Sequence, residues 1–453
     1  MTDGATTWED LAGRRVGVWG LGAEGRASVA RLGAVGAEVI VVDEHPRAAS
    51  AAIDPALLPP EGVRAADDAA MTALGTCDAV VKSPGISRYR PEVAHLVDQG
   101  VEVLGGLGLW LAGVDRSRVV CVTGTKGKST TVAVMAHLAN GLGVRAVACG
   151  NLGLVPWSPD APQDVDLWVV EASSYQVTDF EVAPPVVAVT SLSPDHLPWH
   201  GDLPTYYRDK LSLCTLPGVR VCVASATSPE VVAHADDLGP NVRWVDEHTW
   251  TGPWAEALGL RGVHNTVNAA IARTCLSELG VVGADDDVRV AEAAGGFAGL
   301  ESRLETVAWH DGVEFVDDGL STNVLPTLAA VDTFAGRRLA VIVGGADRDV
   351  DLTPLAVALA ARPEPTLVLT VYTTGPAIES ALRDKIAQRS GTTDPSTTDV
   401  RACDDLDEAV TVGADWARPD GVVLLSPAAA SFDAFTDYRH RSATFRRAIS
   451  ALA

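Results

Sequence analysis

The chain has 453 residues, a length that predicts about three domains, each large enough to bury its own core. Its 59 acidic and 35 basic residues give a formal net charge of −24, and this excess of negative charge disfavours binding to nucleic acid. Hydrophobic residues make up 47% of the chain and charged residues 21%, which excludes intrinsic disorder and predicts a folded protein.

The N-terminal stretch MTDGATTWED is acidic and polar, whereas a secretory signal needs a basic stretch followed by an apolar one. No apolar run approaches the roughly 18 residues of a membrane span, so we expect a cytoplasmic protein without a membrane partner. The cysteines form no CxxC pair and several lie in apolar runs. We expect them to be reduced core residues, with neither disulfides nor a zinc site.

Short β-branched runs alternate with alanine-rich stretches along the whole chain, which is the pattern of parallel α/β layers. The runs fall into three blocks, so the predicted fold class is α/β with three domains, at residues 1–108, 109–302 and 303–453. The predicted strands include VGVWG and VIVVD in the first block, RVVCVTG and LWVVEASS in the second, and RRLAVIVGGA and GVVLLSPA in the third. The Pro- and Asp-rich stretch 390–405 predicts a surface loop.

A glycine-rich turn follows the first predicted strand. Gly20, Leu21, Gly22 and Gly25 form a GxGxxG pattern before a predicted helix, and Asp43 closes the next strand. Such glycines let the backbone approach a phosphate at the positive end of a helix, and the acid can accept a ribose hydroxyl. The block predicts a nucleotide site and leaves open a dehydrogenase, a mononucleotide site or a tight turn without a ligand.

A second glycine-rich loop, TGTKGKSTT at residues 123–131, follows the strand RVVCV and precedes a predicted helix. Backbone N–H groups of such a loop cradle polyphosphate, Lys128 offsets the charge of the outer phosphates, and Ser129 can ligate Mg²⁺. The loop departs from the GxxxxGK[ST] form because Val122 stands where the first glycine is expected. It predicts ATP or GTP binding, for which a dehydrogenase has no use. The residues assigned to the nucleotide are Gly124, Thr125, Lys126, Gly127, Lys128, Ser129 and Thr130.

Acidic and imidazole side chains follow later strands of the second block. Glu171 ends the strand LWVVE, and Asp195 and His196 follow VVAVTSLS, at the strand ends where open α/β sheets place ligands. Oxygen ligands suit Mg²⁺, so Glu171 and Ser129 fit a magnesium site, and His196 is a less usual ligand. Taken alone, such a Glu or His is more often a cap or a loop hydrogen bond, and only the shared position beside a triphosphate loop favours a metal.

Several motifs, in order along nearly the whole chain, carry a resemblance to a known family. They are SPGIS (83–87), TGTKGKSTT (123–131), GNLG (150–153), VVEASSYQV (169–177), PDHLPWHG (194–201), GVHNTVNAA (262–270), SRLE (302–305) and LLSPAAASFDAF (424–435). With them the chain resembles the Mur ligases of peptidoglycan synthesis, and among these the ligases that add glutamate to UDP-N-acetylmuramoyl-L-alanine. The resemblance implies a Rossmann-like N-terminal domain that holds the UDP-sugar, a central P-loop ATPase domain, and a Rossmann-like C-terminal domain that holds glutamate.

The resemblance also implies the reaction. The substrate carboxylate attacks the γ-phosphate of ATP to give an acyl phosphate, and the amine of glutamate then displaces phosphate to form an amide. Two Mg²⁺ ions and lysines would neutralise the charge that gathers between the anions. Lys210, in YYRDKLSL, falls where the family carries a carbamylated lysine, which is in effect a carboxylate on a long arm. From the residues alone, Lys210 is a solvated helix residue.

Residue by residue, the resemblance assigns the following roles, and we expect the enzyme to be a monomer. Catalytic roles fall to Lys128, His196 and Lys210; further ATP contacts to Asn265, Asn268, Arg303 and Asp318; metal ligation to Ser129, Glu171, His196 and carbamylated Lys210; the UDP-sugar to Gly20, Leu21, Gly22, Asp43, Ser83 and Asn151; and glutamate to Thr322, Arg348, Ser431, Phe432 and Tyr438.

Some positions depart from the family pattern. Pro198 stands where an acid is expected, Ser302 where a His is expected, and Leu320 where a lysine is expected. Arg348 replaces a lysine and Tyr438 a phenylalanine. Arg is a planar carboxylate clamp and Lys a point charge, so such an exchange reshapes a dicarboxylate pocket. The stretches DGLSTN and GGADRD favour the branch that adds L-glutamate, and the D-glutamate enzyme is the alternative.

Two further classes stay open. A folylpolyglutamate-type ligase has a similar central ATPase domain. The first block, with its glycine turn and SPG motif, argues against this class. An inactive nucleotide-binding protein is the other class, because Pro198, Ser302 and Leu320 replace family residues. Phosphate release that needs both UDP-sugar and glutamate would exclude it, and titration with NAD(H) tests the dehydrogenase.

Overall fold

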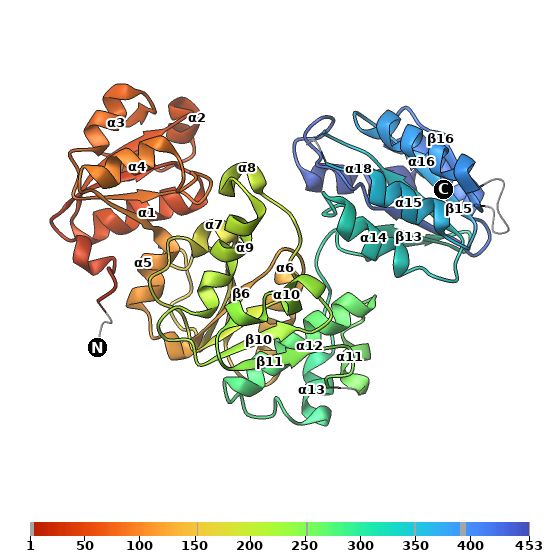
Figure 1. The fold of residues 1–453 in the computed structure, drawn as a ribbon, viewed down its shortest axis with the longest axis horizontal. Coiled ribbons are helices and arrows are strands. Elements are labelled where there is room, and N and C mark those ends of the chain that lie inside the picture. Colours follow the sequence, from red (N-terminus) through yellow and green to blue (C-terminus); the bar gives the residue numbers. More distant parts are fainter. Residues whose placement is uncertain (1–3, 152, 251, 348–349, 390–395, 453) are drawn as a thin grey trace. The chain divides into compact units, whose positions relative to one another are not determined.

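The computed structural model describes residues 4–151, 153–250, 252–347, 350–389 and 396–452 (Figure 1). The chain forms two compact units, one of Met1–Leu258 with Asn265–Phe297 and the other of Gly259–His264 with Ala298–Ala453. The three predicted α/β blocks correspond to three sheets, of which two lie in the first unit and one in the second. The first predicted boundary, at 108/109, falls inside a helix, α5 (Gly106–Gly113). The domain boundaries themselves stay predictions.

The first sheet has the strand order β3-β2-β1-β4-β5, and all its pairs are parallel. The strands and helices of this block are β1 (Arg15–Trp19), α1 (Ala23–Val35), β2 (Glu38–Asp43), α2 (Pro46–Ala51), β3 (Val63–Ala65), α3 (Asp68–Leu74), β4 (Ala79–Lys82), α4 (Pro91–Asp98), β5 (Glu102–Gly105) and α5. The order reverses at β1, because the chain continues to one side through β2 and to the other through β4. The glycine turn therefore lies at a topological switch point, where open α/β sheets bind ligands.

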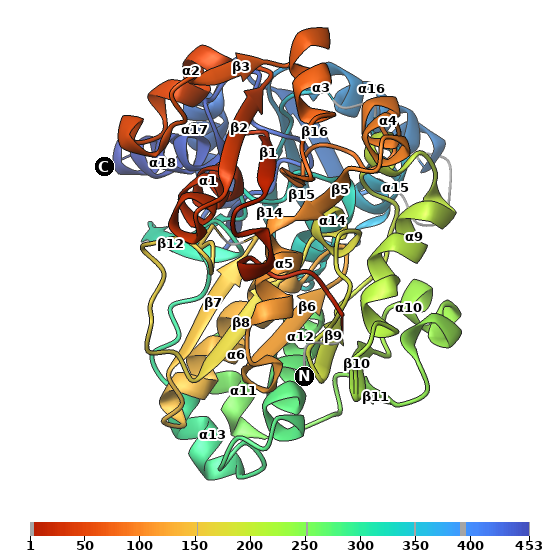
Figure 2. The same cartoon turned by 90° about the vertical axis from the view of Figure 1, so that its left-hand side faces the viewer.

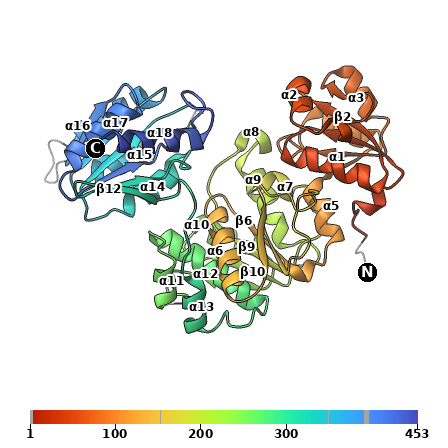
Figure 3. The same cartoon turned by 180° about the vertical axis from the view of Figure 1, so that it is seen from behind.

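The second sheet has the order β11-β10-β9-β6-β8-β7, also entirely parallel. Figure 2 shows β7, β8 and β6 side by side, and Figures 1 and 3 show α11, α12 and α13 gathered together. The elements are β6 (Val119–Thr123), α6 (Lys128–Gly141), β7 (Ala146–Gly150), β8 (Leu167–Glu171), α7 (Ser174–Val177), β9 (Val186–Val189), α8 (Leu197–His200), α9 (Leu203–Leu211), β10 (Val221–Ser225), α10 (Pro229–Ala233), β11 (Val242–Val245), α11 (Pro253–Ala257), α12 (Val263–Glu278) and α13 (Asp287–Ala294). β6 is buried along its length, as a strand covered on both faces must be. It lies between β8 and β9, so the loop that follows it sits at the switch point of this sheet.

The third sheet has the order β12-β13-β17-β14-β15-β16, in which only β12 runs antiparallel to its neighbour within the described residues. Its elements are β12 (Glu305–His310), β13 (Val313–Asp317), α14 (Val324–Asp332), β14 (Leu339–Val343), α15 (Thr353–Ala361), β15 (Thr366–Thr370), α16 (Gly375–Arg389), β16 (Thr398–Ala402), α17 (Leu406–Ala417), β17 (Val422–Leu425) and α18 (Tyr438–Ser450). The prediction of a surface loop over 390–405 is wrong where β16 pairs with β15, and residues 390–395 lie outside the described part.

The sequence also predicted the state of the cysteines. All seven cysteines, each within the described ranges, are free and buried, so the prediction that they are core residues is confirmed. Across the described residues, no helix combines the length and the apolar character needed to span a bilayer.

Candidate active site

The loop TGTKGKSTT (residues 123–131), called the triphosphate loop from here on, turns through two glycines between β6 and α6. Gly124 has φ +135° and Gly127 has φ +90°, values that side chains other than glycine rarely adopt. A Cβ at Gly127 would lie 2.5 Å from Asn268 Oδ1, and one at Gly124 would lie 2.2 Å from Thr190 Oγ1. The loop therefore needs glycine both for its backbone shape and for its close packing.

The segment that follows β9 is hydrogen-bonded to this loop. The Thr125 N–H donates to the carbonyl of Ser191 at 2.7 Å, and the Lys126 N–H donates to Ser191 Oγ at 3.0 Å. Lys126 Nζ forms an ion pair with Asp195 at 3.2 Å. The loop is thus fixed before any ligand binds, which is what an electrostatically preorganised phosphate site requires.

Two amines converge on a single carbonyl oxygen of the loop. The oxygen of Gly124 accepts from Lys128 Nζ at 3.0 Å and from Lys210 Nζ at 2.9 Å. Lys210 is only 2% exposed, and burial, with Lys128 nearby, lowers the pKa of its amine well below the ordinary value. Tyr206 completes the contact, because its ring lies 5.0 Å from Lys210 Nζ and its hydroxyl lies 2.9 Å from Thr125 Oγ1. Lysine side chains gathered around one loop favour a polyanion as its ligand.

Glu171 provides a carboxylate oxygen suited to a metal. It ends β8 in register with Val122 of β6, and its Oε1 accepts from Asn151 Nδ2 at 3.0 Å. Its Oε2 is buried and has no hydrogen-bond partner among the described residues, which is costly unless a cation satisfies it. This orphaned oxygen fits Mg²⁺. Within the described ranges no three His, Cys, Asp or Glu side chains gather as a metal cage, but Mg²⁺ bound to phosphates takes only one or two carboxylates.

His196 lies at the start of α8 with φ +54°. Its ring packs edge-on against Tyr175, with 5.0 Å between ring centroids. Burial, with Lys210 also nearby, lowers the pKa of His196 to about 4. The imidazole is therefore neutral at pH 7, the form in which it can ligate a metal.

The two asparagines predicted to contact ATP lie on α12 in the same unit. Asn265 and Asn268 are buried, and Asn268 Nδ2 donates to Asn265 Oδ1 at 3.3 Å. Asn268 also packs against Gly127, as the close Cβ approach shows. The structure thus brings these two predicted residues to the triphosphate loop.

The glycine turn of the first block is held by Ser83 and Asp43. Ser83 Oγ donates to the carbonyl of Gly20 at 2.7 Å, and Leu21 N–H donates to Asp43 Oδ2 at 2.7 Å. The other oxygen of Asp43 accepts from the His45 N–H, so this carboxylate orients the turn. Asn151, predicted beside the sugar, directly follows β7 and donates to Glu171 Oε1.

The second unit carries the remaining predicted residues. Asp318 is 5% exposed and accepts from the hydroxyls of Ser321 and Ser426 at 2.5 and 2.7 Å. Burial raises the pKa of Asp318 to about 6 against these hydrogen bonds and the charge of Arg303. Ser302 is fully buried and bonds Asp317 at 3.1 Å, so the serine that replaces the expected histidine belongs to a structural hydrogen-bond network.

The residues predicted to hold glutamate differ in exposure. Ser431 is buried, Thr322 and Tyr438 are half-buried, and Phe432 is 65% exposed. Arg348 lies outside the described residues.

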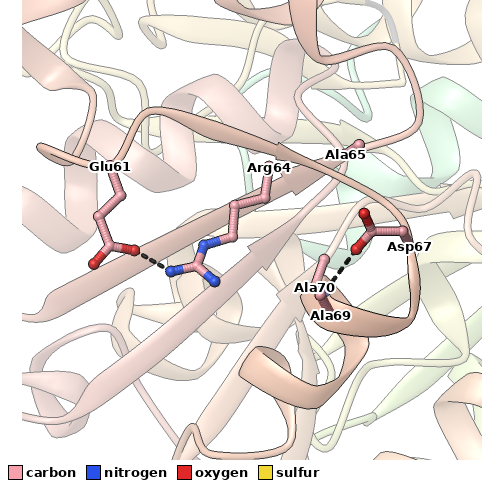
Figure 4. A pocket seen from close by; sticks show the side chains of 6 residues that line it. All are labelled: Glu61, Arg64, Ala65, Asp67, Ala69 and Ala70. Carbon is pink, nitrogen blue, oxygen red and sulfur yellow. Dashed lines mark hydrogen bonds and ion pairs between the residues drawn. The ribbon is translucent and has the colours of Figure 1, made fainter.

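An open hollow of about 290 Å³ lies at the end of β3. In Figure 4 Arg64 points toward Glu61, and Asp67 accepts from the backbone of Ala70. The hollow contains none of the predicted site residues. Glu61 and Arg64 pair with each other, and Asp67 caps the helix that follows.

Comparison with known proteins agrees with these observations. Three family patterns match: "Mur ligase MurD-like, N-terminal domain" at residues 14–105, "Mur ligase middle domain" at 122–245 and "Mur ligase, glutamate ligase domain" at 302–429. A UDP-N-acetylmuramoyl-L-alanine–L-glutamate ligase from a Micromonospora strain is 37% identical over 97% of this chain and 97% of its own. The chain belongs to the Mur ligase family.

Two further proteins are similar to this Mur ligase. The UDP-N-acetylmuramoyl-L-alanine–L-glutamate ligase of Xanthomonas axonopodis pv. citri is 36% identical over 96% of this chain and 95% of its own. The solved structure of the UDP-N-acetylmuramate–alanine ligase MurC from Thermotoga maritima superimposes with a TM-score of 0.57 at 20% identity, over 97% of this chain and 100% of that one.

For this Mur ligase the predicted family, the three-domain α/β fold and the class of ATP-dependent amide ligase are confirmed. The match of the N-terminal pattern to the block with the glycine turn removes the ground for a dehydrogenase, and it agrees with the argument against a folylpolyglutamate-type ligase.

Some residues of the Mur ligase site escaped sequence reasoning. Ser191 and Tyr206 hold the triphosphate loop, yet a serine after a strand and a tyrosine in a helix carry no distinctive spacing. Lys82 could have been found from the sequence, because a lysine at the end of the apolar strand AVVK is unusual. Its ammonium forms a buried ion pair with Asp179 at 2.6 Å.

Proposed function

We propose that this Mur ligase joins L-glutamate to UDP-N-acetylmuramoyl-L-alanine, with ATP consumed through an acyl phosphate. The observation that carries the proposal is the convergence of Lys128 and buried Lys210 on the carbonyl of Gly124. A site with two amines at one oxygen, next to an unpartnered carboxylate oxygen of Glu171, suits a triphosphate with its counter-ion and a second anionic substrate.

In this reaction a carboxylate oxygen of the first substrate bonds to the γ-phosphorus as the bond to the leaving ADP breaks. The amine of glutamate then bonds to the acyl carbon, phosphate leaves, and the nitrogen loses a proton. The N–H groups of the loop and the amines of Lys126 and Lys128 stabilise the charge that develops on the phosphoryl oxygens. When the enzyme holds the acyl phosphate and glutamate together, their reaction becomes effectively unimolecular and water is excluded.

Two Mg²⁺ ions belong to the proposal. Glu171, Ser129 and His196 are the residues that would hold them, and the ions would supply neutralisation of the phosphate charge. The unpartnered Oε2 of Glu171 and the neutral ring of His196 support this assignment.

We also propose that Lys210 is carbamylated. Its buried amine has a lowered pKa, so part of it is neutral. The neutral nitrogen can bond to the carbon of CO₂ and release a proton, and the oxygens of the carbamate formed would suit Mg²⁺. Carbon-13 NMR of the protein with labelled bicarbonate should give a carbamate signal that Lys210→Arg abolishes. A spectrum without that signal in the unaltered protein would remove this part of the proposal.

The choice of L-glutamate is supported by the relatives, which are L-glutamate ligases by name at 36–37% identity, and by the stretches DGLSTN and GGADRD. The C-terminal pattern named for a glutamate ligase domain supports glutamate itself. Our further expectations stay predictions: a monomeric, cytoplasmic enzyme with no nucleic-acid or membrane partner, with Arg303 and Asp318 at ATP and with the assigned UDP-sugar and glutamate contacts.

Incubation of the pure enzyme with ATP, Mg²⁺, UDP-N-acetylmuramoyl-L-alanine and either glutamate enantiomer tests the proposal. We expect phosphate release and the amide product with L-glutamate only. Turnover confined to D-glutamate would contradict the stereochemistry. No turnover with either enantiomer would contradict the function and favour an inactive nucleotide-binding protein.

A further inference from the structure

A chain of hydrogen bonds runs from the first domain to the helix that carries Lys210. The hydroxyl of Tyr89 lies 2.8 Å from both oxygens of Asp209 on α9. Asp209 Oδ2 lies 2.7 Å from His200 Nδ1, and His200 Nε2 lies 3.0 Å from Ser174 Oγ at the start of α7. His200 is 3% exposed and Asp209 7%, so the two hydrogen bonds of His200 are shielded from water.

A second set of contacts runs beside the first. Ser87 Oγ donates to the carbonyl of Trp199 at 2.7 Å, and Trp199 Nε1 donates to the carbonyl of Pro84 at 3.1 Å. The indole of Trp199 stacks on Tyr175, with 4.5 Å between centroids. The loop that follows β4 is therefore fastened to α7 and α8 by hydrogen bonds and by an aromatic stack.

The helix at the end of these contacts faces the triphosphate loop. α9 follows α8 directly and packs against α7 and α8 (Figure 1). Its residues Tyr206 and Lys210 bond Thr125 and Gly124 of the loop. Asp209 is the neighbour of Lys210 in the chain, so a shift of the Asp209 carboxylate moves the base of the Lys210 side chain.

We propose that His200 is a positioning residue: through Asp209 it holds α9, and with it the amine of Lys210, against the triphosphate loop, and Tyr89 completes this hold from the first domain. The inference rests on the proposed function for its effect on catalysis. It goes beyond that function because it assigns a role to three residues outside the catalytic and substrate-binding sets.

The two hydrogen bonds of the His200 ring can be removed one at a time by substitution. A carboxylate only accepts, so Nδ1 donates its proton to Asp209. In His200→Asn the amide nitrogen takes roughly the place of Nδ1 and keeps the bond to Asp209. In His200→Gln the amide nitrogen takes roughly the place of Nε2, keeps the bond to Ser174 and leaves the Asp209 carboxylate short of a donor. Asp209 then keeps the hydroxyl of Tyr89 and the ion pair with Arg208 at 3.7 Å but loses its buried donor, and the loss of a buried hydrogen-bond donor is unfavourable.

The test measures two quantities for each variant: the affinity for a non-hydrolysable ATP analogue with Mg²⁺, and kcat and KM for amide synthesis. We expect His200→Gln to weaken analogue binding about fivefold and to lower kcat about tenfold, with the KM for the UDP-substrate unchanged. His200→Asn should restore most of both quantities. Tyr89→Phe should act in the same direction as His200→Gln but less strongly, because Asp209 keeps its bond to His200.

Tyr207→Phe is the matched control, because it removes a hydroxyl from the same helix on the side that packs against His234; it should leave both quantities unchanged. Equal losses in His200→Asn and His200→Gln would mean that His200 only fills space, and unchanged values in His200→Gln would also overturn the proposal. If His200→Gln does not fold, Tyr89→Phe provides the test, because Tyr89 is 48% exposed and its replacement should leave the fold intact. Unchanged analogue binding and kcat in Tyr89→Phe would then contradict the proposal. Analogue binding needs no glutamate, so it tests the positioning role even if the proposed ligase reaction fails.

Discussion

Lysine is rare in this chain, which has five lysines and thirty arginines. Three of the lysines, Lys126, Lys128 and Lys210, meet at the triphosphate loop, and Lys82 is buried in an ion pair. A guanidinium is a broad planar fork, whereas a lysine amine is compact and fits beside another on one oxygen. Lys126, Lys128 and Lys82 supply compact cations, whereas the buried amine of Lys210 is the group that we propose to be carbamylated.

The backbone of the triphosphate loop gives a prediction for Gly127. In Gly127→Ala the new Cβ meets Asn268 Oδ1, and we expect ATP affinity to fall at least about tenfold, besides a loss of about 1 kcal/mol in the free energy of unfolding. Gly143→Ala is the control, because Gly143 has a similar φ of +89° and open space around the new Cβ within the described residues. Calorimetric titration with an ATP analogue should show a loss of affinity in Gly127→Ala alone, and equal losses in both variants would refute the packing argument.

Glu24, in the glycine turn of the first domain, predicts a pH dependence of stability. Burial raises the pKa of Glu24 from 4.5 to about 7, against the hydrogen bond that Gln176 donates to it at 2.5 Å. The folded state binds this proton more tightly than the unfolded state, so the stabilisation is fully present below about pH 4.5 and is lost as pH rises through about 7. Glu24→Gln stays neutral and should not lose it.

Urea denaturation between pH 4.5 and 8 measures this effect. We expect the unaltered protein to lose on the order of 1 to 3 kcal/mol more than Glu24→Gln across this range. Parallel pH curves for the two proteins would show that Glu24 is ionised in the folded state like an ordinary carboxylate.

At the scale of elements, β4 is joined to the segment after α7 by the ion pair of Lys82 and Asp179. The side chains of both residues are at most 2% exposed, so either charge left alone would be buried without its partner. We expect Lys82→Met to lower the free energy of unfolding by about 3 kcal/mol or more, and Lys82→Met with Asp179→Leu to recover part of the loss. Arg383→Met, which breaks an exposed pair with Glu379 on α16, should change it by less than about 0.5 kcal/mol. Equal effects in Lys82→Met and Arg383→Met would contradict this view.

The elements that the sequence predicted best are the buried parallel strands. β6 and β14 are continuous apolar runs followed by glycine turns, because both of their faces are covered. β16 was mistaken for a loop because TDVRA is polar and lies at the edge of its sheet. Short helices such as α7 have no periodic pattern, and α7 is set by a capping box between Ser173 and Gln176.

The same limit applies to the candidate site. The loop glycines, Lys128 and Glu171 were predicted because each lies at or just after the end of a strand in a recognisable motif. The role of Lys210 came from family resemblance alone, since nothing in YYRDKLSL distinguishes a buried amine from a solvated one. His200 and Asp209 were missed because their bond depends on how α8 and α9 fold back on each other, which no local pattern encodes.

At the scale of the whole molecule, the predicted ATP residues are shared between the two compact units. Asn265 and Asn268 belong to the unit of the triphosphate loop, whereas Arg303 and Asp318 belong to the other.

We propose that Lys128 and its loop make the substrate carboxylate reactive by binding the phosphates of ATP. The most direct measurement compares amide formation and ADP release in Lys128→Ala and in Lys385→Ala, which removes a half-buried lysine of α16. We predict that Lys128→Ala lowers kcat at least about 100-fold and that Lys385→Ala leaves it unchanged. Undiminished amide synthesis by Lys128→Ala would contradict the account.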